Sequence, residues 1–140
     1  MRPDSARAFA ARVATAGCRP GAFNPWAETT IDEAAGNGPG ARLDRLVHHL
    51  DRDAKLVLVG EPPSYQGARI SGIAFTSEAL VIEGAIPGVQ PHGRLSTRGR
   101  PWSEPSGRIM WGALHRAGLA DATETVFHRS KSAAAMNPNQ

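Results

Sequence analysis

The sequence predicts an α/β fold with a parallel sheet, and three patterns predict this class. The apolar run of residues 56–59 stops at Gly60, which is typical of a buried parallel strand. Residues 125–127 have the composition of the start of a second strand. Segments outside these strands repeat apolar side chains at helical spacing. We therefore expect helices and strands to combine in one domain.

Two helices are expected before the first strand. Residues 5–16 are rich in alanine and place Phe9 and Val13 one turn apart. Residues 41–50 place four apolar side chains on one face and polar ones on the other. The apolar face consists of Leu43, Leu46, Val47 and Leu50; Asp44, Arg45, His48 and His49 are expected at the surface.

Two further helical segments are expected after the first strand. A helical turn is predicted at residues 79–81, where Thr76 or Ser77 can cap it. Ser103 is the expected cap of a longer helix that ends at Gly118. Its apolar face is predicted to contain Ile109, Met110, Ala113, Leu114 and Ala117.

Composition limits the class of protein. A length of 140 residues allows one domain with a modest core, and a formal charge of +3 permits nucleic-acid binding without arguing for it. The single cysteine, Cys18, excludes an internal disulfide and a site built from several cysteines. Because no apolar run reaches membrane-spanning length and no signal peptide is evident, we expect no membrane partner and a cytoplasmic location. No metal or other cofactor is expected.

The first strand also predicts the place of a functional site. In open α/β sheets, ligands bind just beyond the carboxyl ends of the strands. Glu61 directly follows Gly60, and Pro62 and Pro63 then restrict the backbone. Glu61 is therefore a candidate for chemistry, although a solvated Glu at an ordinary strand exit fits this spacing equally well.

Residues 60–78 carry a long motif. They read Gly60-Glu61-Pro62-Pro63-Ser64-Tyr65-Gln66-Gly67 and then, after three residues, Ser71-Gly72-Ile73-Ala74-Phe75-Thr76-Ser77-Glu78. This motif resembles the signature of the uracil-DNA glycosylase superfamily, in its branch without an iron–sulfur cluster, and departs from it at Pro62, Ser64 and Ala74. Weaker similarity extends over residues 23–120, through Asn24-Pro25-Trp26 and Pro101-Trp102-Ser103-Glu104-Pro105-Ser106.

The resemblance implies a three-layer uracil-DNA glycosylase-like fold with a central parallel sheet. The match stops after Phe127, and the family's uracil-reading Asn and leaving-group His have no counterpart. We therefore expect residues 1–128 to be the N-terminal portion of such a domain and residues 129–140 to be a disordered tail. The implied partner is DNA that contains uracil or another damaged base, and the implied state is a monomer.

The resemblance also implies roles for single residues. Glu61 would orient or activate the water that attacks the glycosidic bond. Phe75 matches the aromatic that stacks on an extruded base, although a core aromatic under the loop fits equally well. The implied base-binding residues are Gly60, Pro62, Ser64, Tyr65 and Phe75, and the implied DNA-binding residues are Arg69, Ser71 and Arg98. Scattered arginines on loops are more often solvated surface.

The predicted function is hydrolysis of the N-glycosidic bond of uracil, or of another damaged base, in DNA during base-excision repair. Removing one preorganised stabiliser of developing charge typically costs about 10²–10³ in rate, and two are missing here, so the activity is in doubt. The alternatives are a non-catalytic base-binding or DNA-binding protein and a truncated remnant without function. No phosphate-binding loop, nucleophile elbow or metal-ligand cluster indicates another enzyme class.

Overall fold

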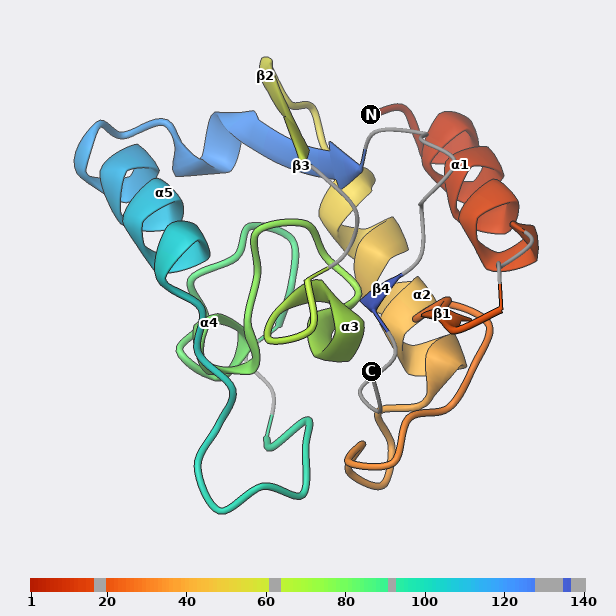
Figure 1. Cartoon of the computed structure of the whole chain (residues 1–140). Helices are drawn as coiled ribbons and strands as arrows, with labels where there is room; N and C mark the ends of the chain where they lie inside the picture. The colour runs from red at the N-terminus through yellow and green to blue at the C-terminus, as the bar shows by residue number, and fades with distance from the viewer. Residues whose placement is uncertain (17–19, 61–63, 91–92, 128–134, 137–140) are drawn as a thin grey trace.

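The computed structural model describes residues 1–16, 20–60, 64–90, 93–127 and 135–136 (Figure 1). These residues form five α-helices, one 3-10 helix and two sheets of two strands each, so the protein is mixed α/β as predicted. In chain order the elements are α1 (Pro3–Thr15), β1 (Ala22–Phe23), α2 (Pro39–Leu50), β2 (Leu56–Gly60), α3 (Ala68–Ser71), α4 (Glu78–Ile82), α5 (Pro105–Arg116), η1 (Ala120–Ala122), β3 (Thr123–Phe127) and β4 (Ala135–Met136).

The parallel sheet consists of β2 and β3. Leu56 pairs with Thr123 and Gly60 with Phe127, so both strands end at the same edge of the sheet. β3 is mostly buried, whereas β2 is mostly exposed, with Val59 at 57%. The parallel strand is therefore confirmed but its predicted burial is wrong, because β2 has one neighbouring strand among the described residues. In Figure 1, β2 projects at the top of the view.

α1 and α2 pack against each other, and each begins within two residues of its predicted start. Leu46 and Leu50 of α2 are buried as expected. Arg45 and His49 are buried too, which contradicts their predicted surface positions. Both use carbonyl oxygens that are distant in sequence: Arg45 Nη1 donates to the Ser71 carbonyl oxygen at 2.8 Å, and His49 Nδ1 lies 2.9 Å from the Pro87 carbonyl oxygen.

α5 begins at Pro105 and is capped by Glu104 instead of Ser103. Its fully buried residues are Gly107 and Trp111, whereas Ile109 is 70% exposed. The predicted apolar face is therefore wrong in part: Met110 and Leu114 pack against the core, and Ile109, Ala113 and Ala117 face outward. The large indole of Trp111, which joins a cluster with Ile73 and Leu80, sets the rotation of the helix.

The loop between α3 and α4 lies against α2 at Gly72. This glycine ends α3 with a φ of 79°, and a Cβ atom there would lie 2.8 Å from the Arg42 carbonyl oxygen. Trp26 Nε1 donates to the Gly72 carbonyl oxygen at 3.1 Å. Glycine is therefore required at this position by both conformation and space, and the loop that follows is held in place.

The predicted tail is described only in part. Ala135–Met136 pair antiparallel with Ala22–Phe23 to form the β1–β4 sheet. Residues 128–134 and 137–140 lie outside the described residues, so the expected disorder of residues 129–140 stays a prediction.

Candidate functional site

A cavity of about 310 Å³ lies at the carboxyl end of β2. The described residues that line it come from β2, the loop before α3 and its start, the loop before α4, the N-cap and first turn of α5, and the end of β3. They are Val59, Gly60, Ser64, Ala68, Ala74, Phe75, Glu104, Ser106 and Phe127. The cavity lies where open α/β sheets bind their ligands. It brings together three of the predicted base-binding residues, Gly60, Ser64 and Phe75.

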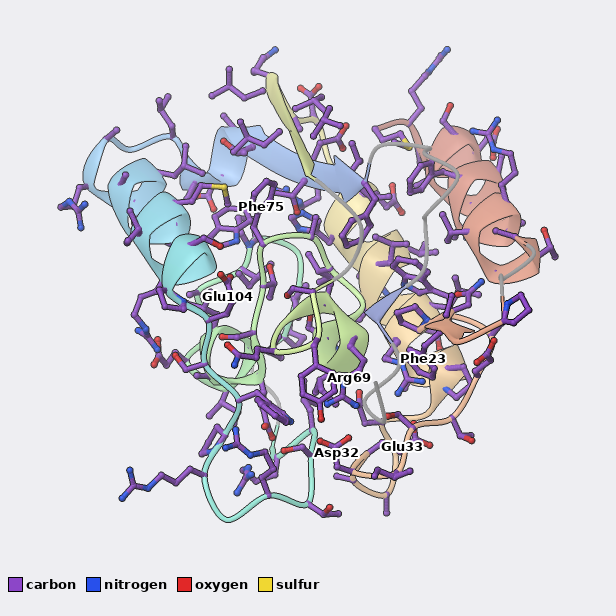
Figure 2. All side chains as sticks on the ribbon, viewed as in Figure 1. Phe23, Asp32, Glu33, Arg69, Phe75 and Glu104 are labelled. Carbon is purple, nitrogen blue, oxygen red and sulfur yellow. The ribbon has the colours of Figure 1, made fainter. Side chains whose placement is uncertain are left out.

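Phe75 has a backbone conformation that is rare for an aromatic residue. Its φ of 59° is the only positive value of a non-glycine residue in the described part of the chain. A Cβ atom on Gly60 would lie 3.1 Å from the Phe75 ring, and a Cβ atom on Gly107 would lie 2.1 Å from the Phe75 carbonyl oxygen. Phe75, labelled in Figure 2, therefore lies between the end of β2 and the start of α5, in contact with two glycines.

Hydrogen bonds fix the loop on both sides of Phe75. The Ala74 carbonyl oxygen accepts from Thr76 Oγ1 at 2.9 Å and from Thr125 Oγ1 of β3 at 3.1 Å. Trp111 Nε1 of α5 donates to Thr76 Oγ1 at 3.3 Å. A positive φ at a bulky residue costs about 1–3 kcal/mol and persists only where the surroundings over-determine it. Here β3 and α5 together do so.

Glu104 lines the cavity, although no role was expected of it from the sequence. Its Oε1 accepts from the Ser106 amide at 3.0 Å and from the Ser106 hydroxyl, and its Oε2 accepts from the Gly107 amide at 2.9 Å. Burial raises the pKa of Glu104, but the hydrogen bonds from Ser106 and Gly107 lower it below that of an ordinary Glu. The carboxylate is therefore ionised at neutral pH. The position before Pro105 can be recognised from the sequence as a helix cap. That Glu104 also lines a cavity could not be recognised, because most of the other lining residues are distant in sequence.

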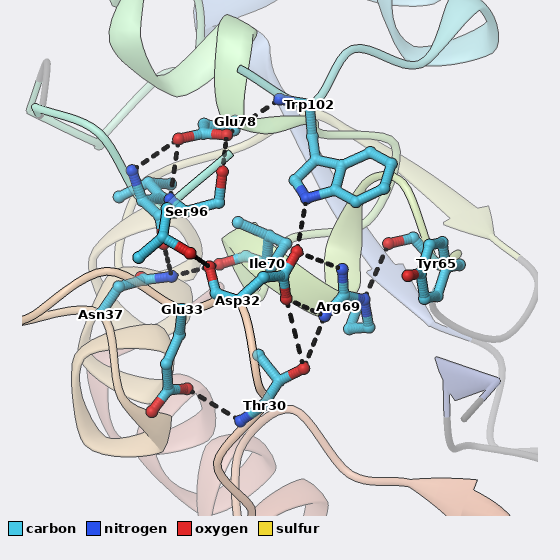
Figure 3. Close-up of polar contacts among 12 residues, drawn as sticks. Thr30, Asp32, Glu33, Asn37, Tyr65, Arg69, Ile70, Glu78, Ser96 and Trp102 are labelled. Carbon is cyan, nitrogen blue, oxygen red and sulfur yellow. Dashed lines mark hydrogen bonds and ion pairs between the residues drawn. The ribbon is translucent and has the colours of Figure 1, made fainter. Parts of the chain in front are cut away.

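Arg69, expected to contact DNA phosphates, is fully buried and paired inside the protein (Figure 3). Its Nη1 and Nη2 lie 2.7 and 3.0 Å from the two carboxylate oxygens of Asp32, and its Nε donates to the Tyr65 carbonyl oxygen at 3.0 Å. Burial raises the pKa of Asp32, but hydrogen bonds from Arg69 and Trp102 lower it below its usual value. This burial contradicts the phosphate contact expected of Arg69.

Ser71, the second expected DNA-binding residue, is also fully buried. Its Oγ donates to the Thr76 carbonyl oxygen at 2.6 Å and accepts from the Ile73 amide at 3.1 Å. These bonds tie the start of the Phe75 loop to its end. The structure therefore gives Ser71 a role in loop geometry, and its burial contradicts direct contact with DNA.

Glu78, the last residue of the motif, is a buried carboxylate at the start of α4. It accepts hydrogen bonds from the amides of Leu95, Ser96 and Trp102, from the Ser96 hydroxyl, and from Arg94 Nε. Burial raises the pKa of Glu78, but these hydrogen bonds lower it below its usual value. Glu78 therefore holds the irregular segment 94–102 against α4.

Tyr65 and Arg98 both contact Trp102, away from the cavity. The rings of Tyr65 and Trp102 meet edge to face with centroids 5.2 Å apart, and Tyr65 is not among the described lining residues. Arg98 is exposed, with its guanidinium carbon 3.7 Å from the centroid of the Trp102 ring. Its expected contact with DNA stays a prediction.

Glu61 and Pro62 lie outside the described residues, so the predicted catalytic and base-binding roles of these two also stay predictions. In the part of the chain that the structure describes, no group of three or more His, Cys, Asp or Glu side chains is arranged to hold a metal ion. None of the described helices is both long and apolar enough to cross a membrane.

Comparisons with protein-family models, with curated proteins and with solved structures returned no match. The resemblance to the glycosylase superfamily therefore rests on the motif residues alone.

Proposed function

We propose that the cavity beside Phe75 binds a nucleobase of DNA and that the protein acts as a uracil-DNA glycosylase-like enzyme. The observation that carries this proposal is the strained Phe75, whose ring lies at the carboxyl end of a parallel strand and lines a cavity. Strained backbone at a bulky residue is typical of functional sites. An aromatic ring that a loop holds rigidly suits a flat, planar ligand.

The proposed reaction is hydrolysis of the N-glycosidic bond of uracil, or of another damaged base. Glu61 directly follows Gly60, a residue that lines the cavity, and would supply the carboxylate that orients the attacking water. Phe75 would stack on the base after it leaves the helix. Ser64 has a small side chain and would leave room for bases with a 5-methyl group. We also propose that the protein has the three-layer uracil-DNA glycosylase-like fold with a central parallel sheet.

One observation favours the second candidate, a base-binding protein without catalysis. The ionised carboxylate of Glu104 lines the same cavity. Hydrolysis leaves negative charge on the departing base, and a nearby carboxylate opposes that charge. Binding of a neutral base carries no such penalty. The two candidate functions therefore share the cavity and differ in whether Glu61 activates a water for hydrolysis.

A glycosylase assay on a single-stranded, uracil-containing oligonucleotide tests the proposal. Wild type, Glu61→Gln and Phe75→Ala are compared, with Ile109→Ala as a control on the exposed side of α5. We expect cleavage by wild type and by the control, none by Glu61→Gln, and binding weakened by about 1–3 kcal/mol in Phe75→Ala. Binding without cleavage by folded wild type would support the second candidate. Absence of both would refute the proposal.

A further inference from the structure

Glu104 and Ser106 present hydrogen-bond acceptors to the cavity. An ionised carboxylate has about four acceptor positions, and the Glu104 contacts in the structure use two on Oε1 and one on Oε2. One position on Oε2 is therefore left for a ligand. Because the Ser106 hydroxyl donates its hydrogen to Glu104, its oxygen is left as an acceptor as well.

The described lining otherwise offers a ligand little polar contact. Apart from Glu104, Ser106 and Ser64, its side chains are apolar or absent. A ligand that fills the cavity must donate to the remaining acceptor position on Glu104 Oε2 or leave that position buried and unpaired, which is costly. The same carboxylate repels an anionic group such as a phosphate. The lining therefore favours a neutral ligand that carries an N–H donor on one edge.

We propose that Glu104 accepts a hydrogen bond from a ring N–H group of the bound base and so determines which bases bind. This inference rests on the proposed function, because it assumes that the ligand is a base. Uracil carries such a donor at N3, and 3-methyluracil has the same ring without it. Hydrogen bonds to ionised groups are stronger than neutral ones, so uracil binds about 10- to 100-fold more tightly than 3-methyluracil.

The test uses two single-stranded oligonucleotides that differ only in one base, uracil or 3-methyluracil. Their affinities are measured by fluorescence anisotropy at pH 7, with Glu61→Gln as the background so that the oligonucleotides stay intact. Glu104→Gln is then added, because its amide replaces one acceptor with a donor. Glu104→Asp is added separately, because Asp is a preferred helix cap but its shorter side chain withdraws the carboxylate from the cavity.

We expect the background protein to prefer uracil about 10- to 100-fold and both Glu104 variants to lose this preference. Affinity for the 3-methyluracil oligonucleotide stays constant, and thermal unfolding shows which variants fold. A preference that persists in a folded Glu104 variant overturns the inference. Equal and measurable binding of both oligonucleotides by the background protein also overturns it, while base binding itself stands. If neither oligonucleotide binds more tightly than undamaged DNA, the proposed function fails with it.

Discussion

Arg69 and strand β2 lie close together in the sequence but differ in how far their side chains are exposed to solvent. Arg69 carries a charge and is fully buried, whereas Val57 and Val59 are apolar and more than half exposed. Burying a charge requires hydrogen-bond partners, and Arg69 finds them at Thr30, at Asp32 and at the Tyr65 carbonyl oxygen. Burying a strand requires neighbours at both edges as well as on both faces, and β2 pairs with β3 alone among the described strands.

The contrast shows that the burial of a side chain depends on the number of suitable neighbours and not on its polarity alone. A few loop residues, Thr30, Asp32 and Tyr65, supply several hydrogen-bond acceptors at once and so enclose the Arg69 guanidinium. A strand needs neighbours along its whole length. Substitutions that remove neighbours in the first region should therefore have large effects, and substitutions in the second should have small ones.

The largest effect is expected at Arg69. Arg69→Met leaves the half-buried carboxylate of Asp32 without its ionic partner, and we expect the free energy of unfolding to fall by about 3 kcal/mol. Arg98→Met is the matched control, because Arg98 also contacts the Trp102 ring but is exposed; its effect should stay within about 1 kcal/mol. Urea denaturation measures both variants, and equal losses would contradict the comparison.

The next largest effect is the loss of stability at acidic pH that we expect from His49. Burial lowers the pKa of His49 to about 4, even though its hydrogen bond to the Pro87 carbonyl oxygen raises it. The Thr125 amide donates to Nε2, so a proton on Nε2 would face another N–H group. Because the unfolded chain binds the proton at higher pH, stability should be full above about pH 6.5 and fall by about 3 kcal/mol as the pH drops to about 4.

His49→Gln should flatten this part of the stability profile relative to wild type. His48→Gln is the control, because His48 is the neighbouring residue but is exposed, and it should keep the wild-type slope. Chemical denaturation at a series of pH values between 4 and 7 measures all three proteins. If the His49 variant kept the full slope, the buried imidazole would not be its source.

Helix α2 also shows how far the sequence could predict the structure. Helical spacing identified α2 and its buried Leu46 and Leu50, because that pattern is local. The burial of Arg45 and His49 depends on carbonyl groups 26 and 38 residues away, which no local pattern reveals. The same distinction holds for β2, since strand propensity is local but the number of neighbouring strands is not.

The candidate site divides in the same way. The motif identified Gly60, Ser64 and Phe75, which line one cavity. It also contained Arg69 and Ser71, whose buried contacts hold the loop. A motif records every residue that a loop needs, and only the structure separates those that face a cavity from those that support it. Glu104 was missed because it reaches the cavity from a separate segment.

A smaller effect is expected where α5 meets the Phe75 loop. Gly107→Ala would place a Cβ atom 2.1 Å from the Phe75 carbonyl oxygen, and we expect a loss of about 1–3 kcal/mol together with weaker base binding. Gly112→Ala on the same helix meets only the end of the flexible Arg116 side chain and should gain up to about 1 kcal/mol. Thermal unfolding distinguishes the two, and a neutral Gly107 variant would mean that the loop moves freely.

The smallest effect is expected in β2. Val59→Thr should change the free energy of unfolding by less than about 0.5 kcal/mol and raise solubility, because it lowers the apolar exposure of an edge strand. Val81→Thr makes the same chemical change at a buried position and should cost about 1–3 kcal/mol. Denaturation and solubility measurements together check the pair; a large loss at Val59 would show that β2 is covered in solution.

The contacts of Phe75 also set the width of the cavity. Its ring touches the end of β2 at Gly60, and its main chain touches the start of α5 at Gly107. The residue thus acts as a spacer of fixed length between sheet and helix. If α5 shifts toward the sheet, the ring and the loop must move with it, so the opening cannot narrow without displacing the surface on which a base would stack. The width of the cavity and the position of the Phe75 ring are therefore coupled, and one residue couples them.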